Sequence, residues 1–188
     1  MPGFMSVALS GTAGAGKSAL IKQLRETRAS ETYGWPVYAV GQIIRDRYKQ
    51  AHPDRAVTFE EFCRNVPHEQ NMQFYAELKL RLESSNMIGD SRFIMNLDPA
   101  KCLRVFLDAP LMVRALRRQG AYPGMSPIQV AEFLNQRDLD DFEKGMKMQG
   151  SDYRDPSHYH LVLNTSIMSI AQEVESINRG LRQARRAS

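Results

Sequence analysis

The chain has 188 residues, of which 43% are hydrophobic and 24% are charged. This length suits one compact domain with a single core, and this composition excludes a disordered chain and a chain with an apolar run long enough to cross a membrane. The N-terminal residues do not form a secretory signal, so we expect a cytoplasmic protein. Cys63 and Cys102 are isolated in the sequence, which argues against a zinc site.

Lysine and arginine number 25 against 21 aspartate and glutamate residues, giving a formal net charge of +4. Much of the excess lies in residues 179–188, RGLRQARRAS. Such an end could contact nucleic acid, but chain ends tend to fray, and we expect a frayed, solvated helix terminus. We therefore predict neither a nucleic-acid nor a membrane partner, and leave open whether the protein is a monomer or a homodimer.

In the first half of the chain, apolar runs alternate with segments of helical spacing. Residues 6–11 (SVALSG) predict a strand that ends at glycine, and residues 18–27 predict a helix after a loop rich in glycine and alanine. Further along, the patterns predict a strand at 36–40, a helix at 41–52, a short helix at 57–66 with Thr58 as its N-cap, and a long amphipathic helix at 68–85.

The second half continues the alternation. Two interior strands are predicted at 86–91 and 102–110, with acidic residues Asp90 and Asp108 where the apolar runs break, and we expect Asp108 to cap the helix at 110–119. A long helix follows at 126–150 with Ser126 as N-cap and Pro127 at its first position, and then a strand at 159–166 and a helix at 169–183. Together these elements predict an α/β fold of one domain, 1–188, with five parallel strands and helices on both faces.

The loop between the first strand and helix reads GTAGAGKS and matches the phosphate-binding motif G-x-x-x-x-G-K-[ST]. Gly11, Gly14 and Gly16 would let main-chain N–H groups turn toward a phosphate, while the helix directs its positive end at the anion. Lys17 would bridge the β- and γ-phosphates, and the Ser18 hydroxyl would ligate Mg²⁺. A chance match is the alternative, but the flanking strand and helix argue against it. We expect ATP and Mg²⁺ to be held by Gly11, Thr12, Ala13, Gly14, Ala15, Gly16, Lys17, Ser18 and Ala19.

Basic residues away from the loop indicate what receives the phosphoryl group, because phosphoryl transfer needs cations around the moving group and an acceptor held in line. Arginines cluster in three places: Arg45 with Arg47, then Arg92, then a group comprising Arg114, Arg117, Arg118, Arg137 and the nearby Lys144.

Several stretches also match a known family. Asp90-Ser91-Arg92 ends one strand, LDAP stands at 107–110, VRALRR at 113–118 and LVLNTS at 161–166. With these motifs the chain resembles the nucleoside monophosphate kinases through most of its length, and most closely the short archaeal-type cytidylate kinases. It differs from the family pattern at Lys144, where arginine is usual, and at Ser91, where glycine is usual.

The resemblance implies roles for individual residues. Arg45 and Arg92 would hold the acceptor's phosphate, and Asp90 would either order Mg²⁺-bound water or pair with Arg92. The acceptor-binding insertion would span about 36–85 and the lid about 117–150. Arg114, Arg117 and Arg118 would belong to the helix and lid that cover the donor. The lid helix would also supply Arg137, the acidic Asp141 near the acceptor base, and Lys144 as a second phosphate contact. Lys17, Arg92, Arg118 and Arg137 would act on the transferred group.

Simpler interpretations exist for some of these residues. Arg114, Arg117 and Arg118 could form the solvated face of an amphipathic helix, and the acidic run containing Asp138 and Asp141 could be only a helix surface. Arg92 has stronger support, because it follows the carboxyl end of a buried strand, where open α/β sheets place their ligands.

The leading hypothesis is a Mg²⁺-dependent kinase that transfers the γ-phosphoryl group of ATP to a nucleoside monophosphate, with CMP or dCMP as the first choice. A kinase for another small acceptor, such as another nucleotide, a nucleoside or a coenzyme precursor, stays open. So does a non-catalytic, nucleotide-dependent switch or binding module, although the chain lacks the N-K-x-D element that reads guanine in GTPases.

Overall fold

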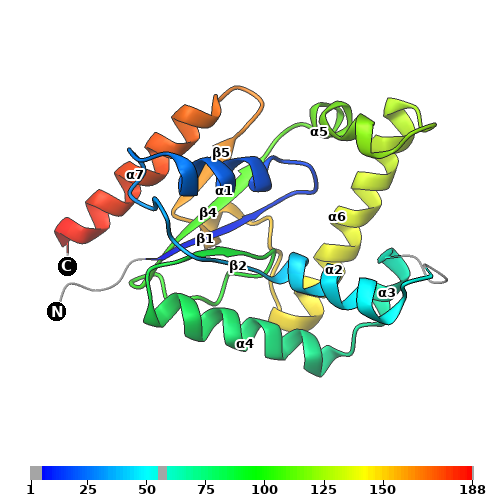
Figure 1. Ribbon diagram of the computed structural model, residues 1–188, viewed down its shortest axis with the longest axis horizontal. Coiled ribbons are helices and arrows are strands. Elements are labelled where there is room, and N and C mark those ends of the chain that lie inside the picture. The colour runs from blue at the N-terminus through cyan, green and yellow to red at the C-terminus, as the bar shows by residue number, and fades with distance from the viewer. Residues whose placement is uncertain (1–5, 55–58, 188) are drawn as a thin grey trace.

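A five-stranded parallel sheet forms the centre of the molecule (Figure 1). The computed structural model describes residues 6–54 and 59–187. The strand order is β2-β3-β1-β4-β5, so the first strand lies in the middle and the chain crosses over it between β3 and β4. The strands are β1 (Ser6–Gly11), β2 (Val37–Ala39), β3 (Ile88–Asp90), β4 (Cys102–Asp108) and β5 (Leu161–Asn164). The predicted five-stranded α/β architecture is confirmed.

Helices follow β1, β2, β4 and β5, whereas β3 leads to β4 without a helix between them. Their bounds are α1 (Lys17–Glu26), α2 (Val40–Ala51), α3 (Phe59–Asn65), α4 (His68–Ser84), α5 (Leu111–Arg118), α6 (Pro127–Gln149) and α7 (Ile170–Ala187). Two short 3₁₀ turns, η1 (Gln119–Ala121) and η2 (Pro156–His158), which the patterns did not predict, precede α6 and β5. Within the described residues, none of these helices combines the length and apolar character needed to span a membrane.

The two faces of the sheet bury different helices because successive side chains of a strand point to opposite sides. Val7 and Leu9 of β1 pack in one cluster with residues of α1 and α7. Ala8, between them, packs in a second cluster with residues of α2 and α4. The central strand is therefore covered on both sides, which explains its continuous apolar character.

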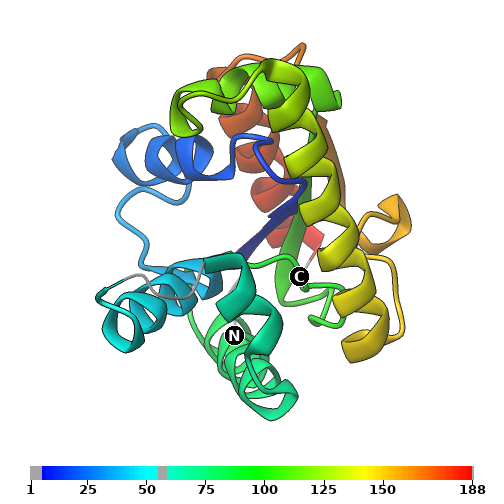
Figure 2. The same cartoon turned by 90° about the vertical axis from the view of Figure 1, so that its right-hand side faces the viewer.

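Helices α5 and α6 pack on each other beyond the edge of these two layers, and α6 runs along one side of the molecule (Figure 2). Their contact forms a third apolar cluster that includes Ala115, Val130, Leu134 and Ala13 of the loop after β1. The predicted start of α6 is confirmed: the Ser126 side chain accepts a hydrogen bond from Gln129 N at 3.3 Å, and Pro127 is the first helical residue. The loop after β1 is thus packed directly against the α5–α6 pair.

Helix α7 continues to Ala187, beyond its predicted end at residue 183, and Arg185 in its last turn pairs with Glu31 at 2.6 Å. Two expectations about local structure are wrong. Asp108 does not cap α5; its carboxylate accepts a hydrogen bond from Thr12 Oγ1 at 2.8 Å. Helix α2 begins at Val40, inside the segment expected to be a strand. The cap expected at Thr58 lies outside the described residues.

Candidate active site

The loop Gly11–Ser18 joins β1 to α1, and its three glycines are required for different physical reasons. The φ angles are 152° at Gly11, 82° at Gly14 and 101° at Gly16. A Cβ atom at Gly11 would lie 2.3 Å from the carbonyl oxygen of Leu107 on β4, so no side chain fits there. Gly16 has open space around it, and only its left-handed conformation favours glycine.

The loop presents unpaired main-chain donors. The N–H groups of Gly14, Gly16, Lys17 and Ser18 form no hydrogen bond with any other residue in the described ranges. They lie at the N-terminus of α1, where the helix dipole adds positive potential. Such a set of donors at a helix start binds a phosphate group.

Lys17 is the central cation of the loop. Its Nζ donates to the carbonyl oxygen of Gly11 at 3.3 Å. Burial, together with the nearby guanidinium of Arg92, lowers the pKa of Lys17 from 10.5 to about 8, although Asp90 and Asp141 act in the opposite direction. A phosphate bound beside the ammonium would restore its charge, because an anion favours the protonated form.

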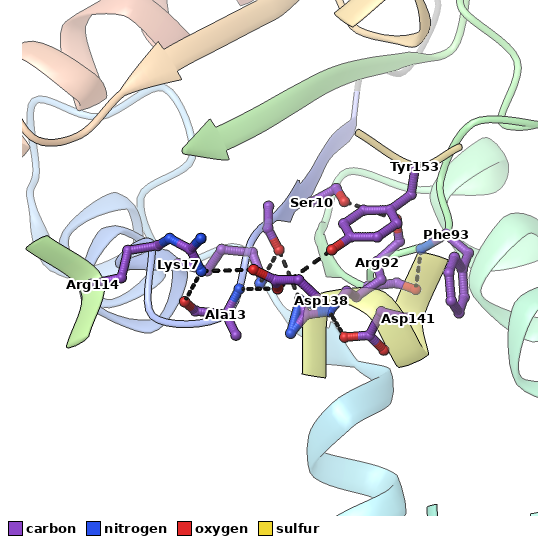
Figure 3. Close-up of polar contacts among 11 residues, drawn as sticks. Ser10, Ala13, Lys17, Arg92, Phe93, Arg114, Asp138, Asp141 and Tyr153 are labelled. Carbon is purple, nitrogen blue, oxygen red and sulfur yellow. Dashed lines mark hydrogen bonds and ion pairs between the residues drawn. The ribbon is translucent and has the colours of Figure 1, made fainter. Parts of the chain in front are cut away.

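Arg92 follows β3 and links the loop to α6 (Figure 3). Its guanidinium donates to the carbonyl oxygen of Gly11 at 2.8 Å and forms an ion pair with the carboxylate of Asp141. Burial, the largest single influence, opposes the charged form, but Asp141, Tyr153, Asp138 and Asp90 together outweigh it, and the pKa of Arg92 is raised. The alternative pairing expected with Asp90 is replaced here by the pairing with Asp141.

A second carboxylate on α6, Asp138, holds the loop from the same side (Figure 3). One of its oxygens accepts a hydrogen bond from the main-chain N–H of Ala13 at 2.9 Å, and the other forms an ion pair with Arg114 at 2.7 Å. Arg114 also donates to the carbonyl oxygen of Ala13 at 2.8 Å. Both polar groups of the Ala13 residue are therefore fixed by side chains of α5 and α6.

These contacts correct two interpretations based on the sequence. Asp138 is only 4% exposed, so this part of the acidic run is not a solvated helix surface. Arg114 is 7% exposed, so it does not belong to a solvated face either. Its guanidinium is directed at Ala13, Asp138 and the carbonyl oxygen of Ala109, and it lies behind the loop rather than where a donor-binding residue was expected.

The other two arginines of α5 lie at its end. Arg117 donates to the hydroxyl of Thr165 at 2.9 Å and to its carbonyl oxygen at 2.7 Å. The same Thr165 hydroxyl donates to the carbonyl oxygen of Ala15 at 2.9 Å, so Arg117 is connected to the loop through one residue. Arg118 lies over the ring of Tyr122, with 5.8 Å from its guanidinium carbon to the ring centroid.

One cavity of about 580 Å³ brings most of the predicted site residues together. Gly11 and Arg114 are not in its lining. Its lining contains seven lysine and arginine side chains against three acidic ones. The predicted residues that line it are Thr12, Ala13, Gly14, Ala15, Gly16, Lys17, Ser18, Ala19, Arg45, Asp90, Arg92, Arg117, Arg118, Arg137, Asp141 and Lys144.

The far end of this cavity lies between α2 and α6. Arg45 on α2 contacts the Gln42 side chain at 3.2 Å, and Lys144 on α6 is partly buried, which lowers its pKa. A second cavity of about 710 Å³ adjoins this end and shares Cys63, Arg137, Asp141 and Lys144 with the first. The space available beside these shared residues therefore exceeds that of the first cavity alone.

The chemistry of two residues fits a hard cation beside the phosphate loop. The Ser18 hydroxyl and the Asp90 carboxylate both line the first cavity and are the oxygen ligands that Mg²⁺ prefers. Within the residues the structure describes, no group of three or more His, Cys, Asp or Glu side chains forms a metal cluster. A magnesium ion here would complete its coordination with phosphate oxygens and water.

The sheet order and the loop place this protein in a broad structural class, the P-loop NTPase fold. Solved structures with the same fold include a gluconokinase from Sinorhizobium meliloti (TM-score 0.59, 15% identity, 99% of this chain and 95% of that one). They also include a shikimate kinase from Bacteroides thetaiotaomicron (TM-score 0.56, 16% identity, 95% and 98%). At these identities the likeness establishes the fold.

Sequence comparison narrows the class to a family. The profile of the cytidylate kinase-like family matches residues 6–167, and the chain belongs to this family. A cytidylate kinase of Pyrococcus furiosus is 28% identical over 179 residues, covering 87% of this chain and 81% of that protein. A cytidylate kinase of Methanosphaerula palustris is 26% identical over 168 residues, covering 89% and 92%.

Sequence reasoning missed several residues around the loop. Tyr153 is fully buried and approaches Asp138 with its hydroxyl at 3.4 Å, and burial raises its pKa. Tyr75 of α4 and Glu173 of α7 line the cavity. No local motif marks any of them, because each reaches the site from an element distant in the chain.

Proposed function

We propose that this protein transfers the γ-phosphoryl group of ATP to a nucleoside monophosphate, with CMP or dCMP as the first candidate acceptor. The observation that carries the proposal is the single cavity in which the phosphate loop lies beside a separate set of cations, among them Arg45 and Arg92. The family membership and the names of the relatives support the same reaction.

On the donor side, the free N–H groups at the start of α1 would bind the β-phosphate. Lys17 would contact the β- and γ-phosphates and stabilise the charge that develops on the transferred group. Arg117 and Arg118, at the end of α5, would cover the donor. Arg114 and Asp138 would act indirectly, by holding the peptide groups of Ala13 in position.

On the acceptor side, Arg45, Arg92 and Lys144 would hold the phosphate, and Asp141 would bind the base. In the structure the carboxylate of Asp141 is paired with Arg92. An acceptor phosphate that binds Arg92 would free Asp141 to bind the base, so the phosphate contact and the base contact would form together. An acceptor oxygen would then attack the γ-phosphorus in line as the bond to the β-phosphate oxygen breaks, without a covalent intermediate.

Two segments would move during the reaction: the acceptor-binding insertion, about 36–85, and the lid, about 117–150. Closure of these segments would bring Arg118 and Arg137 to the transferred group and exclude water. Ser18, with Asp90 through bound water, would hold Mg²⁺. When bound, Mg²⁺ would neutralise phosphate charge and align the donor.

A screen of acceptors with ATP and Mg²⁺, read as ADP release, tests the proposal. We expect turnover with CMP or dCMP, and Lys17→Ala should lose several orders of magnitude in kcat/KM while keeping the circular dichroism spectrum of the wild type. Absence of turnover with every nucleoside monophosphate would contradict the nucleotide kinase. Nucleotide binding without any phosphoryl transfer would favour the switch or binding module instead.

A kinase for a different small acceptor is the second candidate. The cavity of about 710 Å³ beside Arg137, Asp141 and Lys144 favours it, because this additional space would admit acceptors of a shape other than that of a nucleoside monophosphate. The same screen, extended to nucleosides and coenzyme precursors, separates the candidates by which acceptor gives the highest kcat/KM.

A further inference from the structure

Glu173, in the first turn of α7, is a buried carboxylate that opens into the cavity beside the phosphate loop. The residue is only 3% exposed. Its main-chain N–H bonds to the carbonyl oxygen of Ser169 at 3.0 Å, but its carboxylate forms no hydrogen bond with any residue in the described ranges. Burial raises the pKa of Glu173, and the guanidinium of Arg117 acts in the opposite direction.

Helix capping does not explain this carboxylate. Ser169 and Gln172 already cap the start of α7. The Gln172 side chain accepts a hydrogen bond from Ser169 N at 2.8 Å, and Ser169 Oγ accepts one from Gln172 N at 3.3 Å. An acidic residue that favours the helix dipole can remain in water, whereas burying it without a partner costs free energy. A buried acceptor that faces a cavity is completed when a ligand supplies the N–H.

The position of Glu173 along the cavity indicates which part of a ligand it meets. The phosphate loop lies between the start of α7 on one side and α2 on the other (Figure 1). Arg45 and Lys144 line the α2–α6 end, while Met168, Ile170 and Glu173 line the α7 end. If the γ-phosphate points toward the acceptor end, then the base of the donor extends toward α7.

The α7 end also has surfaces that suit a flat base. Met168 and Ile170 provide apolar contact, and Arg117, which is fixed by its two hydrogen bonds to Thr165, provides a planar guanidinium near Glu173. These apolar and planar groups would contact any purine ring and would not distinguish one purine from another. Glu173 is the group at this end that could distinguish one purine edge from another, because a carboxylate accepts hydrogen bonds and donates none.

We propose that Glu173 accepts a hydrogen bond from the exocyclic amino group of the donor's adenine and thereby selects a 6-aminopurine over a 6-oxopurine. The inference rests on the proposed function, which places the donor triphosphate on the phosphate loop. A 6-oxopurine would bring its carbonyl oxygen against the carboxylate, so two acceptors would face each other and neither would be satisfied.

The test compares ATP with inosine triphosphate, which carries an oxo group in place of the 6-amino group. Binding of both is measured by calorimetry without an acceptor, for the wild type, Glu173→Gln and Glu173→Ala. We expect the wild type to bind ATP at least about tenfold more tightly, as one charge-assisted hydrogen bond allows. Glu173→Gln should narrow this ratio to about threefold or less, because its amide can donate to the oxo group.

Two controls separate the base from the phosphates. Inorganic tripolyphosphate, which has no base, should bind the wild type and both variants equally. Glu175→Gln changes a neighbouring residue of α7 that pairs with Arg182 at 2.7 Å on the surface, and it should keep the wild-type preference for ATP.

The outcomes distinguish this inference from the proposed function. Equal binding of ATP and inosine triphosphate by the wild type would overturn the role of Glu173 while leaving the phosphate loop intact. An unchanged preference in both Glu173 variants would overturn it as well. If neither the triphosphates nor tripolyphosphate bound, the proposed function would fall together with the inference.

Discussion

At the scale of single residues, the site depends on charges that the fold holds partly or fully out of water. Lys17 is held beside Arg92, and Asp138 is held between Ala13 and Arg114. In the first case the environment disfavours the charge until an anion arrives. In the second the charge is already paired within the protein, so it serves the structure of the loop.

Lys17 should make nucleotide binding depend on pH. Its pKa of about 8 means that the ammonium loses its proton above pH 8 in the free protein, whereas bound phosphates raise that pKa. Binding must then take up a proton, and the affinity for ATP should fall by up to about tenfold per pH unit above pH 8. Calorimetry from pH 7 to pH 9.5 measures this.

The lowered pKa of Lys17 affects stability in the opposite direction from binding: the free energy of unfolding should rise with pH. The unfolded chain holds the Lys17 proton up to its ordinary pKa, so between about pH 8 and 10.5 the native state binds fewer protons and this residue makes unfolding costlier as pH rises. For the measurement of ATP affinity against pH, Lys17→Arg is the control, because its guanidinium stays charged over this pH range. A pH dependence of ATP affinity that persists in Lys17→Arg would contradict the assignment.

Asp138→Asn should destabilise the protein, because it leaves the buried Arg114 cation without its counter-charge. Breaking a buried ion pair from one side costs about 3–5 kcal/mol. The free energy of unfolding, measured with urea, should fall by an amount of this order. Glu132→Gln, on the exposed side of the same helix, should change it by less than about 0.5 kcal/mol. Equal effects of the two substitutions would show that the contacts of Asp138 are not stabilising.

At the scale of elements, α6 connects the two ends of the cavity. Asp138 and Asp141 face the phosphate loop and Arg92, and Arg137 and Lys144 line the cavity from the same helix. The helical repeat explains this arrangement, since residues three and four apart share a face. A shift of α6 along its axis would therefore move donor-side and acceptor-side contacts together.

The start of α6 lies far along the helix from these residues, and its cap should affect stability more than turnover. Ser126→Ala removes the side-chain half of the capping box and should cost about 1 kcal/mol of unfolding free energy, with faster amide hydrogen exchange in the first turn. Ser176→Ala, within α7, is the matched control and should cost less. Unchanged exchange at the start of α6 would contradict the importance of the cap.

At the scale of the whole molecule, positive charge is concentrated in two places, the cavity and residues 179–188 at the end of the chain. The lining of the cavity has seven basic side chains against three acidic ones, while the entire chain has a net charge of +4. Like charges held this close repel one another, so a polyanion that binds the native state should stabilise it.

Tripolyphosphate should therefore raise the melting temperature. At a concentration about 100 times its Kd, binding contributes about 2.7 kcal/mol, which corresponds to roughly 5–10 °C for a chain of this size. Differential scanning fluorimetry measures the shift, with sodium chloride at the same ionic strength as the control, and Lys17→Ala should reduce it. An equal shift with chloride would show that general screening, not binding, stabilises the protein.

The sequence by itself determined the fold class, the phosphate loop and the positions from which basic residues reach it, because strand and helix periodicity and the loop motif are local properties of the chain. Only the tertiary structure decided how the buried charges are paired. Asp138 looked like a surface residue and Arg114 like a ligand-binding one, yet each is the partner of the other. Glu173 carried no signal at all, since its place beside the loop arises from the packing of α7 against the sheet. Pairing and burial depend on contacts between segments far apart in the chain, and a pattern read along the chain does not contain them.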